Sequence, residues 1–250
     1  MTPVLELGFL ILFALLIGLF LILSRRKTAR PAVLRRIEAF ERLPATVGEA
    51  VESGRRLHLS LGSGVIGQAD TATTLAGLTA ATQTAAAAVV SDKPPIITSA
   101  DGSAMLLAQD ALKAVYRQQN AEERFDAGAA RVIGLSPVSF SAALAPLVKD
   151  EAVAGNVLIG AVSPEAVLLA EASRRAGAPI LAGSDNLAAQ AAFLAVADDT
   201  LLGGDLFAAG AYLDKARAHV ASLRAQDVLR VILILVILAG AAAKTLGLLQ

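Results

Sequence analysis

Short apolar runs and longer helical stretches alternate through the middle of the chain. The apolar runs lie at residues 57–61, 95–98, 131–135, 156–161 and 179–182, with a sixth at 199–202. The helical stretches that follow the first five runs lie at residues 69–90, 103–119, 138–147, 164–176 and 187–195. Strands that alternate with helices are typical of a parallel sheet with helices on both faces. We therefore predict a Rossmann-like α/β domain over residues 53–205, with five or six mostly parallel strands.

An apolar segment precedes this domain. Residues 4–23 read VLELGFLILFALLIGLFLIL, and Glu6 is their only charged residue. About 20 apolar residues suffice to cross a bilayer as a helix. A secretory signal peptide would begin with basic residues and end at a small-residue cleavage site, whereas this segment begins MTPVLE and is followed by SRRKTAR. We predict an uncleaved transmembrane anchor over residues 1–24.

A second apolar segment, VILILVILAGAAAKTLGLLQ, begins at Val231. Arg230 precedes it and Lys244 lies inside it, so that only 13 uncharged residues separate the two bases. At a rise of about 1.5 Å per residue that stretch is short for a span, but residues 228–250 suffice when both basic side chains reach the headgroups. We predict a second transmembrane helix at residues 228–250, preceded by a connecting helix at 206–227. The alternative is a buried helix of the α/β domain.

Basic residues flank both predicted spans on the side of the α/β domain. They are Arg25, Arg26, Lys27, Arg30, Arg35 and Arg36 after the first span, and Arg217, Arg224 and Arg230 before the second. Positively charged flanks stay cytoplasmic, which predicts a cytoplasmic domain anchored in the cell membrane with both termini on the outer side. Glu6 and Lys244 then both fall near the outer boundary of the membrane. We expect them to form an ion pair; alternatively, each reaches the headgroups.

Residues 25–52 form a basic juxtamembrane stretch that becomes amphipathic. Ile37, Phe40, Leu43 and Val47 recur at helical spacing within residues 35–52. The sequence leaves three interpretations open. The helix connects anchor and domain, lies along the membrane surface, or stacks on the α/β domain.

A glycine-rich motif follows the first predicted strand. Gly62, Ser63, Gly64 and Gly67 belong to a G-x-G-x-x-G pattern between a strand and a helix, which is the context of a dinucleotide fingerprint. Asp101 follows the second strand, where a ribose-binding acid is expected, although its distance from the glycines exceeds the usual spacing of about 20 residues. The functional interpretation is a nucleotide or another phosphorylated ligand. The alternative is a tight turn in a closely packed, Ala-rich domain.

Four serines stand where a predicted strand gives way to a helix: Ser99, Ser136, Ser163 and Ser184. Ser is a favoured N-cap, and Pro suits the first helical position that follows it, as after Ser136 and Ser163. All four junctions would fall at the carboxyl edge of the sheet, where open α/β sheets bind ligands. The residues are therefore either helix caps or part of a ligand site.

Charge and composition restrict the chemistry further. The chain has 250 residues with 22 basic and 22 acidic ones, and this zero net charge argues against nucleic-acid binding. With no Cys and two His, His58 and His219, it offers neither a thiolate site nor a His-rich metal centre. The acidic stretch of Asp198, Asp199 and Asp205 lacks a further ligand at metal spacing. We predict no metal, no cofactor and no catalytic residue. We expect His58 to be hydrogen-bonded in the core; alternatively, it reaches the carboxyl edge of the sheet.

The remaining compositional feature is an excess of small and apolar residues. Hydrophobic residues make up 55% of the chain, the mean hydropathy is +0.62, and the predicted helices are rich in Ala, which lets helices approach closely. We therefore predict a membrane-anchored, self-associating scaffold that forms a homo-oligomeric ring or large assembly. One alternative is a membrane-tethered sensor or enzyme that binds a nucleotide at the glycine-rich motif. Another is a subunit of a transport or secretion complex.

The run ESGRRLHLSLGSG, together with TTLAGL and DKPPIITSAD, resembles an uncharacterised family of bacterial membrane-anchored proteins catalogued as a domain of unknown function. The resemblance extends from about Glu52 to Ala243. It implies a bacterial membrane protein with an α/β domain, and it implies no activity.

Overall fold

The computed structural model describes residues 34–214 and 217–245, together with residues 7–8, 10, 13–15, 17–18 and 20–22 of the first apolar segment. Residue contacts divide the chain into two units. The α/β unit is Arg35–Asp214, and the terminal unit combines Met1–Leu34 with Lys215–Gln250.

The α/β unit alternates strands and helices, as the sequence pattern predicts. Its elements are α2 (Glu38–Glu52), β1 (Arg56–Gly62), α3 (Thr71–Ala88), β2 (Ile96–Ser99), α4 (Gly102–Gln118), η1 (Glu122–Arg124), η2 (Ala127–Ala129), β3 (Ala130–Val132), α5 (Pro137–Asp150), β4 (Val153–Ala161), η3 (Pro164–Val167), α6 (Leu168–Ala176), β5 (Ile180–Gly183), α7 (Leu187–Val196), β6 (Asp199–Leu201), η4 (Gly203–Ala208) and η5 (Gly210–Asp214). The helix α8 (Arg217–Thr245) belongs to the terminal unit.

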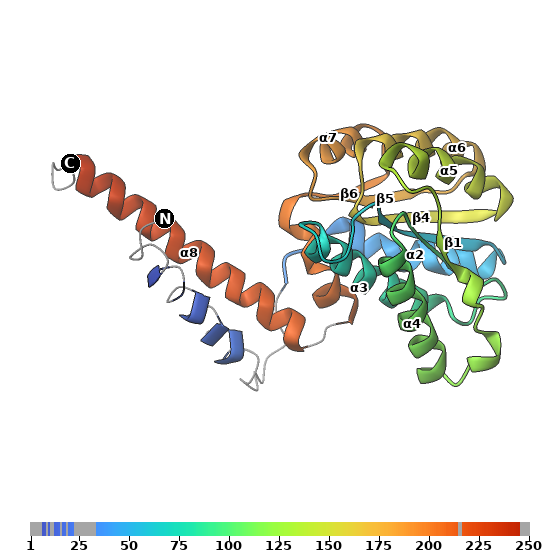
Figure 1. Cartoon of the computed structure of the whole chain (residues 1–250), viewed down its shortest axis with the longest axis horizontal. Coiled ribbons are helices and arrows are strands. Elements are labelled where there is room, and N and C mark those ends of the chain that lie inside the picture. Colours follow the sequence, from blue (N-terminus) through green and yellow to red (C-terminus); the bar gives the residue numbers. More distant parts are fainter. Residues whose placement is uncertain are drawn as a thin grey trace. The chain divides into compact units, whose positions relative to one another are not determined.

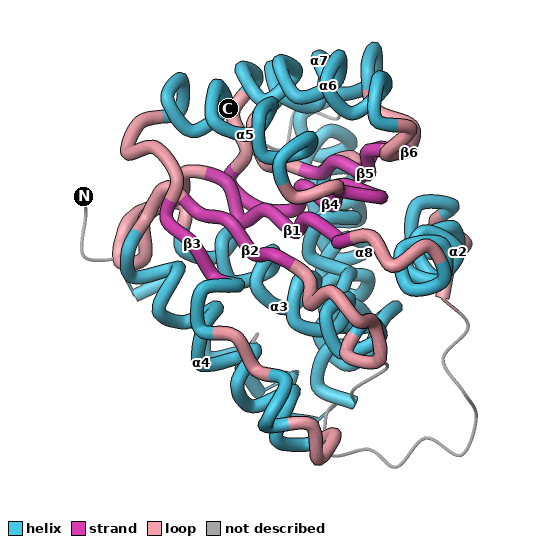
Figure 2. Tube along the Cα trace, turned by 90° about the vertical axis from the view of Figure 1, so that its right-hand side faces the viewer, coloured by secondary structure: helices cyan, strands magenta, loops and turns pink. Residues whose placement is uncertain are grey.

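All six strands are parallel and form one sheet in the order β3-β2-β1-β4-β5-β6 (Figure 2). This is the strand order of Rossmann domains, in which the chain reverses its direction of travel between β1 and β4. The register places His58 of β1 between Ile96 of β2 and Asn156 of β4. The predicted α/β class and parallel sheet are therefore confirmed.

Helices cover both faces of the sheet. α2, α3 and α4 lie on one face, and α5, α6 and α7 lie on the other (Figure 1). The central strands are consequently buried along almost their whole length, which explains their continuous apolar runs. Small residues bring α3 against the sheet, because a Cβ on Gly77 would lie 2.0 Å from the carbonyl oxygen of Ile159 in β4.

The position of α2 decides among the three interpretations of residues 35–52. Its apolar side chains Phe40, Leu43 and Val47 are buried against the α/β unit. The ring of Phe40 also stacks on that of Tyr212, with centroids 5.2 Å apart. The amphipathic helix therefore stacks on the α/β domain.

The structure contradicts the first half of the predicted connecting helix at residues 206–227, whereas residues 217–227 are helical and run on into the second apolar segment, as predicted. The chain instead forms the 3-10 segment η4 and the π-helical turn η5, and α8 then begins at Arg217 and continues through position 228 to Thr245. Gly203, Gly204 and Gly210 disfavour a regular α-helix, while the irregular turns bury Leu206 and nearby alanines in the α/β unit.

In the terminal unit, α8 has the length and composition of a membrane-spanning helix. Its segment Ala218–Thr245 has 28 residues and contains an 18-residue window with a mean hydropathy of 2.2. The first apolar segment contributes the shorter helix Phe13–Ile22 to the described residues, so that a span at residues 4–23 stays a prediction. Lys244 is exposed near the end of α8. Glu6 lies outside the described residues, and its pairing with Lys244 stays a prediction as well.

Candidate functional site

The carboxyl edge of the sheet is the place where an open α/β sheet binds ligands, next to the point where the strand order reverses. Because all six strands are parallel, the residues that follow them meet at this one edge. Gly62 ends β1, Asp101 follows β2, Ser136 follows β3, Ser163 follows β4 and Ser184 follows β5. The structure thus brings the predicted site residues to the same edge.

Close packing accounts for two glycines of the motif. Gly62 has φ +80°, and a Cβ there would lie 2.3 Å from the carbonyl oxygen of Ala161 in β4. A Cβ on Gly64 would lie 2.3 Å from Thr74 Oγ1 and 2.6 Å from Ala161 Cβ. The turn can therefore pack against α3 and β4 only with glycine at these two positions.

The loop also differs from a dinucleotide fingerprint, in which the motif itself opens the helix. Here α3 begins at Thr71, four residues after Gly67. Two backbone N–H groups of the loop already donate to protein acceptors: Ser63 to the carbonyl of Ala161 at 2.9 Å, and Gly67 to Thr71 Oγ1 at 2.8 Å. These two N–H groups are therefore not free to donate to a ligand phosphate.

Asp101 and Ser136 act as helix caps. The Oδ2 atom of Asp101 accepts a hydrogen bond from the backbone N–H of Ala104 at 2.7 Å, at the start of α4. Ser136 forms a reciprocal capping box with Ser139 at the start of α5. Both side chains satisfy helix N–H groups that would otherwise lack a partner.

Ser184 does not cap a helix. Its Oγ donates to the carbonyl oxygen of Val162 at 2.6 Å and accepts from the N–H of Asn186 at 3.2 Å. Asn186 is the N-cap of α7, and its Oδ1 accepts from the N–H of Ala189 at 3.0 Å. The predicted cap is therefore two residues away from the actual one, and Ser184 instead joins the loops after β4 and β5.

Two hydroxyls near this edge are left over. Thr74 Oγ1 and Ser163 Oγ are buried and lack a hydrogen bond of normal geometry to the described residues, as does Glu165 Oε2. The Ser163 hydroxyl nevertheless interacts with the Glu165 carboxylate, because the Glu165 backbone N–H and then this hydroxyl lower the pKa of Glu165. A buried polar atom is normally satisfied by protein or by ordered water. These two atoms are the groups that a ligand or a water molecule at the carboxyl edge would bind.

The electrostatics of the edge disfavour an anion. The loops and first helical turns that follow the six strands are all described, and they contain no Lys, Arg or His. They contain five acids: Asp70, Asp101, Glu165, Asp185 and Asp205. Asp185 lies at the N-terminus of α3, because its Oδ2 accepts from Thr73 Oγ1 at 2.5 Å. A phosphate at that helix terminus would face this carboxylate.

Exposed apolar side chains stand among these acids. We name them the apolar edge; they are Val65, Leu135, Val138, Leu187 and Leu202. Leu135 is 85% exposed and Leu187 is 81% exposed. The sequence analysis missed this surface, although GLSPV and DNLAA place a leucine beside a polar turn in both cases.

The surface continues onto α7. Its exposed residues form the α7 apolar face, which consists of Leu187, Ala188, Ala191, Leu194, Ala195 and Val196. The only polar residue of the helix, Gln190, points inward. Its Nε2 donates to the carbonyl of Ser184 at 2.9 Å, and its Oε1 accepts from the N–H of Gly203 at 3.2 Å. The helix thus turns an entirely apolar face outward, the reverse of an ordinary surface helix.

A buried hydrogen-bond network centred on His58 lies inside the α/β unit, away from the carboxyl edge. His58 Nδ1 is 2.9 Å from Asn156 Oδ1, and His58 Nε2 is 2.8 Å from Thr98 Oγ1. Asn156 Nδ2 in turn donates to Ser173 Oγ of α6 at 3.0 Å. The amide oxygen can only accept, so Nδ1 carries the proton and Nε2 accepts from the threonine. Burial lowers the pKa of His58 to about 4, so this neutral histidine is hydrogen-bonded in the core, as expected.

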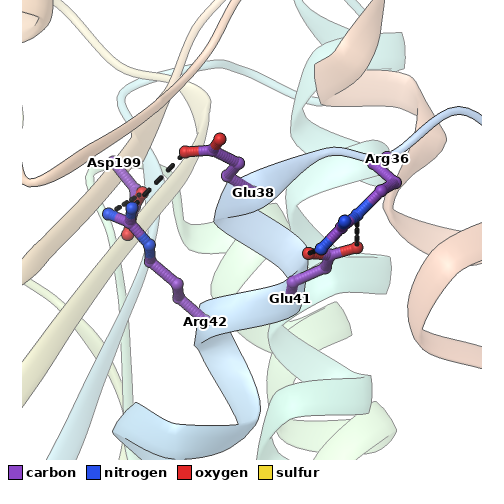
Figure 3. A network of polar contacts seen from close by, with 5 residues as sticks. All are labelled: Arg36, Glu38, Glu41, Arg42 and Asp199. Carbon is purple, nitrogen blue, oxygen red and sulfur yellow. Dashed lines mark hydrogen bonds and ion pairs between the residues drawn. The ribbon is translucent and has the colours of Figure 1, made fainter.

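A charged network joins α2 to the edge strand β6 (Figure 3). Arg42 contacts Asp199 at 3.1 Å and Glu38 at 3.4 Å, and Arg36 contacts Glu41 at 2.7 Å. The network borders a cavity of about 390 Å³. Burial raises the pKa of Asp199, while Arg42 opposes that rise. Each of these charges has a partner, so the network fastens α2 to the sheet.

The described residues contain no group of three or more His, Cys, Asp or Glu side chains that could hold a metal ion. The acids Asp198 and Asp199 are engaged elsewhere. Asp198 Oδ2 accepts from the N–H of Ile180 at 2.7 Å, and Asp199 pairs with Arg42.

Together these features define an α/β protein with a Rossmann-order parallel sheet and an apolar C-terminal helix of membrane-spanning length. The family model named Domain of unknown function (DUF6754) matches residues 4–250, and the chain belongs to this family. The predicted family resemblance is thereby confirmed, whereas the bacterial and membrane-anchored character stays a prediction. No curated protein and no solved structure matches the chain.

Proposed function

We propose that this chain is a membrane-anchored, self-associating scaffold protein. The observation that carries the proposal is the apolar edge together with the α7 apolar face. Contiguous exposed apolar surface marks sites of protein association in soluble domains. Here it occupies the edge of the fold that other open α/β sheets use for small ligands.

The membrane part of the proposal rests on α8. A helix of this hydropathy is stable in water only when it is covered, and none of its apolar window is buried by the residues that the structure describes. Arg224 and Arg230 lie in the half of α8 that is closer to the α/β unit in sequence. We propose a cytoplasmic α/β unit, because basic flanks stay on that side.

The mass and shape of the full-length protein in detergent test the proposal. Light scattering with negative-stain imaging is expected to show one homogeneous ring or shell, many times heavier than the 25.6 kDa chain. Leu187→Asp, at the residue that the apolar edge and the α7 apolar face share, should reduce that mass. Val90→Asp serves as the matched control, because Val90 is also exposed but follows α3 at the opposite edge of the sheet.

Two results would contradict the scaffold. A monomer or dimer in several detergents would refute self-association. A second protein that co-purifies at a fixed ratio would instead indicate a subunit of a hetero-complex, such as a transport or secretion machine.

A nucleotide or other phosphorylated ligand is the second candidate. The strand order and the two unsatisfied hydroxyls of Thr74 and Ser163 favour it. The test is calorimetric titration with ATP, NAD and inorganic phosphate. Val65→Asp is the control, because it adds a carboxylate to an exposed loop position. A substitution at Gly64 is unsuitable, because its Cβ would displace the Thr74 hydroxyl, and a loss of binding could then reflect the altered fold.

A further inference from the structure

A groove lies between α5 and α6 on the same face of the sheet as α7. Its volume is about 660 Å³. We name it the α5–α6 groove; its apolar lining includes Ala145, Pro146, Leu168, Ala172 and Ala176. The small alanines leave room for a neighbouring backbone, because interhelical distance depends on the side chains at the contact.

The α7 apolar face matches this groove in size. α7 has ten residues and α6 has nine, so both are about 15 Å long. Leu187 and Leu194 are the large side chains of the face. A helix that carries large apolar residues on one side and lies in an apolar groove is a common mode of recognition between proteins.

The charges around the two surfaces are opposite. Three bases, Lys149, Arg55 and Arg175, and one acid, Glu171, line the groove. Arg175 pairs with Glu171, and Arg55 donates to the carbonyls of Val153 and Ala176, but neither Lys149 nor Arg55 forms an ion pair with a described residue, so the lining keeps a net positive charge. Asp185 and Asp198 flank α7, and they too lack an ion pair within the described chain. Complementary charges of this kind guide the register of an interface.

The same charges disfavour other occupants of the α7 apolar face. Two α7 helices packed together would bring their flanking acids, Asp185 and Asp198, against acids in either orientation. A membrane-surface helix carries Lys and Arg on its polar side, whereas α7 contains no base. The α5–α6 groove, with its apolar lining and its excess of bases over acids, suits both the apolar face and its acids.

We propose that the α7 apolar face of one copy packs into the α5–α6 groove of a second copy. This inference rests on the proposed self-association and names the surfaces that carry it. The two surfaces are different, so after the first contact one copy keeps a free groove and the other keeps a free face. Such heterologous contacts repeat, and they close into a ring when the rotation between copies allows it.

Cysteine cross-linking tests the contact directly, because the chain has no Cys of its own. Full-length Ala191→Cys and Ala172→Cys are co-expressed with different affinity tags and oxidised mildly in detergent. Ala191 lies in the middle of α7 and Ala172 in the middle of α6, so a disulfide requires the two backbones to approach within about 7 Å. We expect a disulfide between the two variants and none within either variant alone.

Leu106→Cys with Ala172→Cys is the matched control. Leu106 is exposed on α4, which covers the opposite face of the sheet, and this pair should not cross-link. Lys149→Glu should lower the yield of the Ala191–Ala172 disulfide several-fold, because it places an acid beside the acids that flank α7.

The outcomes separate the contact from the proposed function. An assembly of unchanged mass without the Ala191–Ala172 disulfide would overturn this contact and leave the scaffold standing, whereas a monomer would overturn both. A disulfide with Ala191→Cys alone would assign α7 to a helix-to-helix contact between copies. Quenching of Leu194→Trp by brominated lipid, in a chain without Trp, would assign the face to the membrane. Either of the last two results overturns the proposal.

Discussion

Acidification should destabilise the α/β unit through His58. Burial lowers the pKa of His58 from 6.5 to about 4 in the folded chain. The unfolded chain therefore binds a proton as the pH falls through 6.5, while the folded chain does not until about pH 4. Stability is full above pH 6.5 and is lost between pH 6.5 and 4, at up to about 1.4 kcal/mol for each unit of pH. The loss over the whole window is about 3 kcal/mol.

Urea denaturation of the full-length protein in detergent measures this loss, with far-UV circular dichroism as the signal. Free energies of unfolding are compared at pH 7, 6, 5 and 4 for the wild type and for His58→Gln. The glutamine amide can still meet Asn156 and Thr98 but cannot titrate in this range. The variant should be less stable at pH 7, and the difference should shrink by about 3 kcal/mol at pH 4.

The chain supplies a matched control, because His219 is its only other histidine. His219→Gln should keep the pH dependence of the wild type. Parallel pH profiles for wild type and His58→Gln would refute the reasoning, since they would mean that the imidazole titrates alike in the folded and unfolded chains.

Three substitutions probe packing, capping and the orientation of α7, each through the free energy of unfolding. Gly64→Ala should cost about 1–3 kcal/mol because its Cβ meets Thr74 Oγ1; an unchanged stability would mean that the turn is open. Asp101→Ala should cost about 1 kcal/mol by removing the cap of α4, and a larger loss would point to a second role. Gln190→Leu should cost about 1–3 kcal/mol by leaving the N–H of Gly203 unsatisfied, whereas a gain in stability would contradict the inward amide.

Periodicity located the strands well because the central ones are buried on both faces and read as apolar runs. It failed at β3, where the predicted strand 131–135 is shortened to Ala130–Val132. Gly134 there has φ +61°, which turns the chain, and the following Leu135 is exposed. The sequence alone does not distinguish an apolar residue that is exposed on the surface from one that is buried in the core.

The strand order could not be predicted, because alternation alone fits any order of parallel strands. The candidate site was located at the carboxyl edge by topology, but the roles of its residues depend on neighbours from distant loops. The Ser184 hydroxyl donates to the carbonyl of Val162 in the neighbouring loop, and Asn186 is the N-cap of α7 instead. Similarly, α7 is apolar at almost every position, and only the inward hydrogen bonds of Gln190 show which face is free.

The position of β1 in the sheet has a consequence for biosynthesis. β1 is central, yet its partner β4 follows about 100 residues later, with Arg56 paired to Val153. At about 5–20 residues per second, a nascent chain waits about 5–20 s with one edge of β1 open. Open strand edges pair with other chains, and a second nascent copy of this chain offers the same segments. Exchange of the segment from β4 to β6 between copies is therefore the misassembly to which this topology is most exposed, and slower translation lengthens the interval in which it can occur.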